Sequence, residues 1–320
     1  MRAAYGEAVD GFDPDAAAAE LTGALWPLGS AARAEQEKRY LKSDLEFIGV
    51  TVPDLRRAVK AAVKAQLAGG GRRGARLDRE TAVAWALALW REPVHERRAA
   101  AVGILQLAVT TLDASDLATV ERLIRASRTW AYVDVLAGNI GGAVALRDPS
   151  AWERIDAWAT DEDFWVRRSA LLALLPGIRA GRPDLQRFTR YADPMLAEKE
   201  FFIRKAIGWV LRETSRREPQ WVATWTAAHL AEISGVTFRE AVRRLPPEDK
   251  ARLEQRRAAL APLAVRLSAQ RGRWRGRPVG CLGGVCLIGG RVWEDGAAGD
   301  EGAVRWRHSS SRTGYRMTTP

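Results

Sequence analysis

The chain has 320 residues, 47% of them hydrophobic, which is enough to form a continuous core in one extended or two compact domains. Because it has no apolar run of the roughly 20 residues that a membrane span needs, and no secretory-signal pattern at its N-terminus, we expect a cytoplasmic protein without a membrane partner, nucleoid-associated if it is bacterial. The formal net charge of +11 favours nucleic acid or another polyanion as partner, although a biased genome composition also produces an excess of arginine.

Helices are predicted one after another from Pro14 to about Gln270, because apolar residues recur there at three- and four-residue spacing. The clearest predicted helices span residues 54–68, 79–90, 94–109, 114–126, 151–160 and 200–216. The predicted breaks fall at residues 69–74, Pro93, residues 141–142, Pro149, residues 176–177, Pro194, Pro219 and residues 246–247. We therefore expect a lead of residues 1–13, a helical domain of residues 14–270 and a disordered Gly/Arg-rich tail of residues 271–320.

Four predicted helices each carry a charged residue at an equivalent position. These residues, Arg98, Asp134, Arg168 and Lys205, are called the charged column below. The steps between these residues are 36, 34 and 37, close to the period of helical solenoids such as HEAT arrays, roughly 40 residues. Equivalent positions of a solenoid line up on one surface, usually the concave one. The spacing predicts an all-α, HEAT-like superhelix (an α-solenoid) with a concave basic groove, and an ordinary α-bundle is the alternative.

Aromatic residues accompany this charged column. Trp130 precedes Asp134 by four residues and Trp209 follows Lys205 by four, so each aromatic shares a helix face with a charge. Cations suit a polyanion such as DNA, whereas a carboxylate among them repels phosphate. Asp134 therefore either takes part in chemistry or forms a salt bridge to an arginine of the column that ties adjacent repeats.

Four segments, in this order, resemble the AlkD-like DNA alkylation repair enzymes, which are HEAT-repeat DNA glycosylases: YLKSDLEFIGVTVPDLRR (40–57), WAYVDVLA (130–137), FWVRRSALLALL (164–175) and EFFIRKAIGWVLRE (200–213). The resemblance extends over roughly residues 15–245. It implies a monofunctional glycosylase that excises cationic alkylated purines, notably 7-methylguanine and 3-methyladenine, from double-stranded DNA. A solenoid that uses its concave face for DNA can act as a monomer, which is the oligomeric state we expect.

The resemblance also implies roles for individual residues. By motif position they are a catalytic carboxylate at Asp134, aromatics that hold the lesion nucleotide at Trp130 and Trp209, a phosphate-contacting residue at Arg168 and an aromatic near the lesion backbone at Tyr40. Further candidate DNA-binding residues are Arg98, Arg167, Arg204 and Lys205, whose charges would fix the register without reading sequence. Asp44 and Glu46 depart from the family's pattern, and their negative charge opposes DNA binding near Tyr40.

The predicted chemistry needs one carboxylate. An N7- or N3-alkylated purine already carries positive charge, so its departure needs no general acid, and an anion beside C1′ stabilises the cationic sugar of the transition state. Two other classes of function stay open: a catalytically silent HEAT-repeat module that binds DNA, and a scaffold whose groove accepts an acidic peptide.

The histidines and cysteines suggest no further site. Cys281 and Cys286 have no companion ligand cluster, and the three histidines are scattered, so we expect no metal and no cofactor. His95 stands beside Arg97 and Arg98 and is expected to be solvated.

Overall fold

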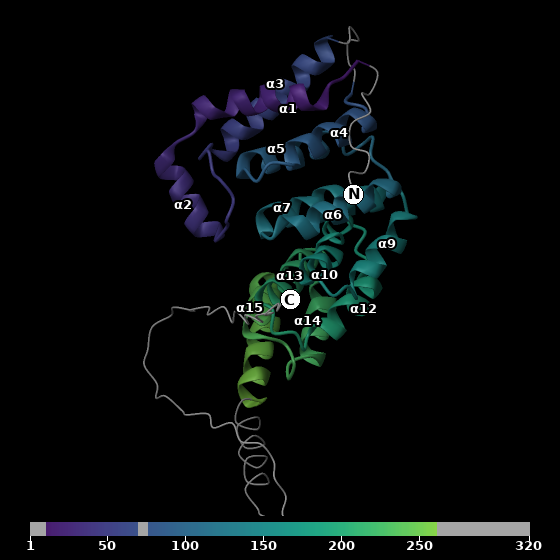
Figure 1. Cartoon of the computed structure of the whole chain (residues 1–320). Coiled ribbons are helices and arrows are strands. Elements are labelled where there is room, and N and C mark those ends of the chain that lie inside the picture. The colour runs from purple at the N-terminus through teal and green to yellow at the C-terminus, as the bar shows by residue number, and fades with distance from the viewer. Residues whose placement is uncertain (1–10, 70–75, 261–320) are drawn as a thin grey trace, which may run out of the picture. The chain divides into compact units, whose positions relative to one another are not determined.

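The computed structural model describes residues 11–69 and 76–260, and these residues are helical apart from short connections (Figure 1). Within these ranges the chain has no strand, and Glu46 and Val94 form an isolated parallel bridge. The described helices belong to one compact unit. Four predicted parts lie wholly or partly outside the described residues: residues 1–10 of the lead, residues 70–74 of the break at 69–74, residues 261–270 of the helical domain and the tail of residues 271–320.

The helices follow the predicted segments closely. They are α1 (Pro14–Leu25), α2 (Ala31–Leu41), α3 (Val52–Gly69), α4 (Arg79–Trp90), α5 (His95–Leu107), α6 (Leu117–Ser127), α7 (Trp130–Asp134), the π-helix η3 (Val135–Gly142), α8 (Ala143–Arg147), α9 (Ala151–Trp158), α10 (Phe164–Leu172), α11 (Leu175–Arg179), α12 (Leu185–Met195), α13 (Phe201–Thr214), α14 (Pro219–Ala228) and α15 (Gly235–Ala241). Residues 247–260 form one more helix. Three-residue 3₁₀ turns, η1 (Trp26–Leu28), η2 (Ala114–Asp116) and η4 (Val242–Arg244), complete the order.

The predicted break at residues 141–142 is wrong, because helical structure runs without interruption from α7 through η3 to α8. A Cβ atom on Gly142 would lie 2.3 Å from the carbonyl oxygen of Ala173, just after α10. This glycine therefore permits close packing between two helices and does not end one. The prediction mistook a packing glycine for a helix terminator. Pro176 likewise stands in the first turn of α11, where its missing N–H costs no hydrogen bond.

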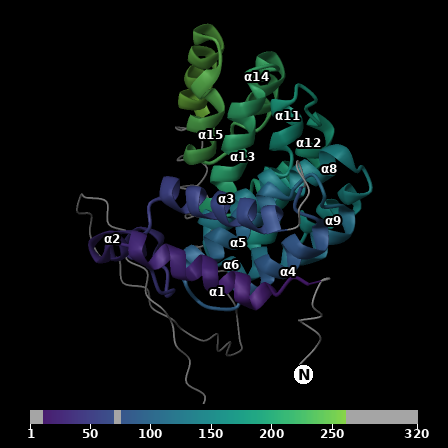
Figure 2. The ribbon, with the colours of Figure 1, turned by 90° about the horizontal axis from the view of Figure 1, so that it is seen from above.

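The helices that carry the charged column pack against one another in chain order. Helix α5 contacts α7 and η3, these two contact α10, α10 contacts α13, and α13 contacts α15. Figure 2 shows α14 beside α13 and α15, which it contacts. Stacking of successive helix pairs with a period of 34 to 37 residues is the predicted solenoid arrangement, so the all-α helical-repeat fold is confirmed.

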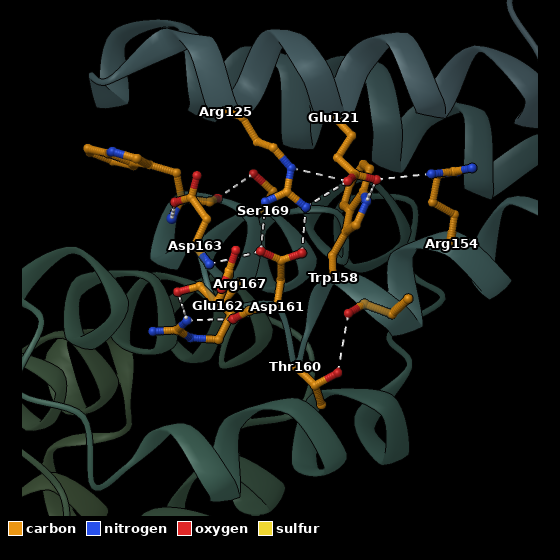
Figure 3. Close-up of polar contacts among 12 residues, drawn as sticks. Glu121, Arg125, Arg154, Trp158, Thr160, Asp161, Glu162, Asp163, Arg167 and Ser169 are labelled. Carbon is orange, nitrogen blue, oxygen red and sulfur yellow. Dashed lines mark hydrogen bonds and ion pairs between the residues drawn. The ribbon is translucent and has the colours of Figure 1, made fainter.

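A polar network joins α6 to the helix pair that follows it (Figure 3). Arg125 of α6 bonds Glu121 in its own helix at 2.7 Å and both oxygens of Asp161, which follows α9, at 2.8 and 2.5 Å. Glu121 also accepts hydrogen bonds from Trp158 at 2.9 Å and Arg154 at 3.1 Å. Because α6 packs on both α7 and α10, this network fixes the spacing between those two helices.

Candidate active site

One cavity of about 350 Å³ gathers most of the residues predicted to act on DNA. Its walls come from α2, α7, α10 and α13. They are Tyr40, Trp130, Asp134, Arg168, Phe201, Phe202, Lys205, Trp209 and Arg212. The lining thus combines five aromatic rings and three cations with a single carboxylate, that of Asp134. Residues far apart in the sequence meet here because the helix pairs stack with their equivalent positions aligned.

The local sequence places Trp130 and Asp134 at the two ends of a short helix. Thr129 caps α7 and its hydroxyl accepts the N–H of Ala131, so Trp130 is the first helical residue. Asp134 ends α7, and the π-helix η3 starts at the next residue. π-Helical segments are rare and often mark functional sites. The four-residue step brings indole and carboxylate to one face, as predicted, and both line the cavity.

Asp134 and Arg168 form a two-bond ion pair across neighbouring helices. Nε and Nη2 of Arg168 donate to the two carboxylate oxygens of Asp134 at 2.9 and 3.0 Å. The remaining nitrogen of Arg168 donates to the carbonyl oxygen of Phe202 at 2.5 Å. The Arg168 side chain is 3% exposed and that of Asp134 is 19% exposed. The guanidinium therefore orients the carboxylate, and the phosphate contact predicted for Arg168 stays a prediction.

Two aromatic side chains, Tyr40 and Trp130, form one wall of the cavity. Their rings pack edge to face with centroids 5.9 Å apart and an interplanar angle of 89°. Tyr40 is 71% exposed, whereas Trp130 is half-buried and packs against the core. Trp209, also half-buried, lines the cavity from α13. Aromatic groups from α7 and α13 thus line the same cavity as the Asp134 carboxylate.

Three lining residues were not predicted: Phe201, Phe202 and Arg212. A signal for Arg212 was present, because it follows Lys205 and Trp209 at the seven- and three-residue spacing of one helix face. Lys205 lies 3.7 Å from Glu240 of α15, and Arg212 forms a second ion pair with the same carboxylate. Glu240 stands 35 residues after Lys205 and so continues the charged column.

Arg98 of the predicted column does not line this cavity. Its guanidinium carbon lies 5.2 Å from the ring centroid of Trp90, and Nη1 donates to the carbonyl oxygen of Ala126 at 3.3 Å. Burial lowers the pKa of the Arg98 side chain. The Arg98 side chain packs over Trp90 and does not reach the cavity. The third cation of the cavity lining is Arg212 instead.

Arg167 and Arg204 also lie outside the cavity lining, and both bond to Glu198. Arg167 forms a two-bond pair with the Glu198 carboxylate at 2.9 and 2.7 Å, and its Nη1 donates to two backbone carbonyls. Arg204 donates to the backbone carbonyl of Glu198 at 2.8 Å. The two arginines thus brace the turn before α13, and their predicted contacts with DNA are untested.

The prediction that His95 is solvated is wrong. Its ring stacks on Phe47 with centroids 4.6 Å apart, and Nδ1 lies 2.6 Å from the hydroxyl of Tyr132. Burial lowers the pKa of His95, although the neighbouring Glu96 opposes this shift. Across residues 11–69 and 76–260 no group of three or more His, Cys, Asp or Glu side chains is placed to hold a metal ion.

A family model described as DNA alkylation repair enzyme matches residues 21–245. The chain belongs to the DNA alkylation repair enzyme family. The matched segment contains every residue of the cavity and ends just after η4, before the helix of residues 247–260. It nearly coincides with the range of the resemblance, roughly residues 15–245. Membership of this family supports a role in alkylation repair.

One solved structure supports the helical-repeat fold. A structure described as a predicted DNA alkylation repair enzyme from Enterococcus faecalis is 23% identical, covers 68% of this chain and 97% of its own, and superposes with a TM-score of 0.60. AlkD2 from Streptococcus mutans is 18% identical over 66% of this chain and 99% of its own, with a TM-score of 0.45. No curated protein matches the chain. Among the helices of the described ranges, none has the length and hydrophobicity needed to cross a membrane.

Proposed function

We propose that this member of the DNA alkylation repair family is a monofunctional DNA glycosylase. It hydrolyses the N-glycosidic bond of cationic alkylated purines, such as 7-methylguanine and 3-methyladenine, in double-stranded DNA, and it acts as a monomer. The observation that carries the proposal is Asp134, the one carboxylate in the lining of an aromatic and cationic cavity. A surface that only bound phosphates would gain nothing from this negative charge.

The proposed reaction uses the positive charge that the lesion already carries. When the bond between C1′ and the purine nitrogen breaks, its electron pair goes to the base, which leaves neutral, and positive charge develops on the sugar. The Asp134 carboxylate stabilises that charge, and water then adds its hydroxyl to C1′ and releases a proton. No general acid is needed, which separates this reaction from glycoside hydrolysis with two carboxylates.

Arg168 acts in this proposal as a positioning residue. Its two hydrogen bonds to Asp134 hold the carboxylate in one orientation before substrate binds, so less reorganisation is required as charge develops. Lys205 is 46% exposed and is available to a phosphate. Trp130 and Trp209 offer ring faces to the cationic base or sugar, a contribution of about 0.5–2 kcal/mol each.

A second candidate function is supported by the same ion pair. Because Arg168 already satisfies both oxygens of Asp134, the carboxylate has a structural partner and does not require a substrate to explain it. In that case the protein is a catalytically silent HEAT-repeat module that binds DNA, and Asp134 ties two adjacent repeats.

Release of free 7-methylguanine from duplex DNA, measured for the wild type and for Asp134→Asn, separates the two candidates. The glycosylase requires release by the wild type and none by the variant, with duplex binding kept by both. Glu198→Gln is the matched control, because it removes another arginine–carboxylate pair, that of Arg167, outside the cavity. Binding without release by the wild type, across a panel of alkylated purines, would establish the silent module.

A further inference from the structure

Two residues of the chain have a left-handed backbone without being glycine. Lys42 has a φ of 49° and Arg128 a φ of 50°, and no other non-glycine residue in 11–69 and 76–260 has a positive φ. A side chain in this region crowds the backbone, so the conformation is costly and persists where the surroundings impose it. Each residue directly follows a helix, α2 or α6, at a position where glycine is the usual residue. The chain thus keeps a cation at two positions that favour glycine.

Both cations adjoin the aromatic pair of the candidate active site. Lys42 stands two residues after Tyr40, and Arg128 stands two residues before Trp130. The rings of Tyr40 and Trp130 pack with centroids 5.9 Å apart, which brings the end of α2 close to the start of α7. Each of the two segments that form this aromatic wall therefore carries one of the two left-handed cations.

The fold itself does not use either charge. Lys42 and Arg128 are exposed, and within the described ranges neither side chain forms a hydrogen bond or an ion pair. Arg125, three residues before Arg128, shows the contrast, because it pairs with Glu121 and Asp161. Neither an ion pair nor a hydrogen bond of the side chain compensates the backbone strain at Lys42 and Arg128. Strain of this kind is found at functional sites, where a ligand supplies the reason for it.

A second arginine lies beside Arg128. Nη1 of Arg98 donates to the carbonyl oxygen of Ala126, two residues before Arg128, at 3.3 Å. Burial is the main reason why the pKa of Arg98 is lowered; Tyr132 opposes this shift, and the positive charge of Arg128 adds to it. Two like charges at this range repel each other, and an anion bound beside them would offset the repulsion. The end of α6 is therefore suited to an anionic group.

We propose that Lys42 and Arg128 bind DNA phosphates adjacent to the nucleotide that enters the cavity. Phosphate contacts position a duplex without reading its sequence. Because the left-handed region is narrow, the direction in which each side chain leaves the backbone is restricted before DNA binds. Asp44, two residues after Lys42, carries the opposite charge, so Arg128 is the stronger contact of the two. The proposal deepens the proposed function and rests on it for the choice of DNA as the ligand.

Fluorescence anisotropy with an undamaged labelled duplex, at several salt concentrations, tests these contacts without requiring excision. Lys42→Gly and Arg128→Gly should each weaken binding and reduce the slope of log affinity against log salt by about 0.9, the value for one phosphate contact. Arg182→Gly is the matched control and should keep the wild-type slope, because Arg182 is an exposed arginine in the turn after α11, outside the cavity lining. An unchanged slope in either test variant, or an equal change in the control, overturns the proposal.

Melting temperatures separate the lost charge from a folding artefact. Glycine adopts the left-handed conformation freely, so both test variants should melt at or above the wild-type temperature. Arg128→Gln keeps the strain and loses the charge, so it should melt below Arg128→Gly yet show the same reduced slope. Arg128→Lys keeps the charge and should keep the slope. If Arg128→Gly melted well below the wild type, the arginine would be serving the fold, and the proposal would fail.

Release of free 7-methylguanine, measured in parallel for the wild type, distinguishes this proposal from the proposed function. Reduced slopes for the two glycine variants without any excision by the wild type would keep the phosphate contacts and remove the glycosylase. Excision by the wild type with unchanged slopes would keep the glycosylase and remove the contacts.

Discussion

Arg168 donates two hydrogen bonds, of 2.9 and 3.0 Å, to the carboxylate of Asp134. Its third nitrogen donates to the carbonyl oxygen of Phe202 at 2.5 Å. The carboxylate that would stabilise a cationic sugar is therefore immobilised by a neighbouring repeat, and neither helix alone defines its direction. The Asp134–Arg168 pair is thus expected to contribute both to the stability of the fold and to the proposed reaction. Substitution of either residue should change the free energy of unfolding and the rate of base release.

Arg168→Gln should slow release of 7-methylguanine by about 10- to 100-fold and lower the free energy of unfolding by about 3 kcal/mol, because Asp134 loses its partner in a mostly buried setting. Single-turnover release and urea unfolding measure the two effects. In the double variant with Asp134→Asn the stability should recover in part, with a coupling energy of about 1–3 kcal/mol. A coupling energy near zero would contradict the ion pair.

Trp130→Ala and Trp209→Ala should each slow release of 7-methylguanine by about 2- to 30-fold, the equivalent of a cation–π contribution of about 0.5–2 kcal/mol. Trp152→Ala is the control: its indole packs on Arg187, 4.3 Å from ring centroid to guanidinium carbon, outside the cavity. That variant should lose stability but keep the rate of the folded protein. Equal losses in all three variants would mean that the tryptophans act only through folding.

Lys205→Gln should weaken DNA binding and reduce the slope of log affinity against log salt by about 0.9, the value for one lost phosphate contact. Arg167→Gln and Arg204→Gln should change that slope less, since both arginines bond to Glu198. Fluorescence anisotropy with a labelled duplex at several salt concentrations gives the slopes. A larger slope change for Arg167 than for Lys205 would place the DNA over the turn before α13.

Gly142→Ala should destabilise the fold by about 1–3 kcal/mol, since its Cβ would lie 2.3 Å from a backbone oxygen of Ala173. Gly138→Ala, in the same π-helix, is the matched control, because its Cβ would lie 3.5 Å from the nearest atom, the oxygen of Leu172. Thermal unfolding of the two variants should separate clearly. Similar melting temperatures would show that η3 can move away from Ala173 at little cost.

The network around Arg125 should protect the fold at neutral pH and cease to do so in acid. Hydrogen bonds from Arg125 lower the pKa of Asp161 against the effect of burial. Burial raises the pKa of Glu121, but hydrogen bonds from Arg125, Trp158 and Arg154 outweigh it, and the net shift is downward. A carboxyl with a depressed pKa adds stability that is complete above its unfolded pKa and is lost as the pH falls through the folded one.

Arg125→Met should therefore lower the free energy of unfolding by about 1 kcal/mol at neutral pH, a small value because its side chain is 37% exposed. The difference from the wild type should shrink as the pH falls below the ordinary carboxyl values of 4.5 for Glu121 and 3.8 for Asp161. Urea unfolding across this pH range measures it. A difference that stayed constant in acid would show that packing by the arginine stem, and not its charge, supplies the stability.

Local sequence patterns were sufficient to predict the helices and their repetition. Apolar spacing gave the extents of α4 (Arg79–Trp90) and α13 (Phe201–Thr214) to within two residues, because a helix that buries one face must repeat its apolar residues at that period. The steps of 34 to 37 residues also brought Asp134, Arg168 and Lys205 to one place, since stacked repeats align equivalent positions.

The partners of these charged side chains follow from packing between repeats, which the sequence pattern does not contain. Arg98 and Arg168 occupy equivalent positions in the sequence, yet Arg98 packs over Trp90 and Arg168 closes on Asp134. The ion pairs of Lys205 and Arg212 with Glu240 were likewise invisible in the sequence. The physical reason is that helical period is a property of one segment, whereas the partner of a long side chain depends on atoms that another repeat brings within a few ångströms.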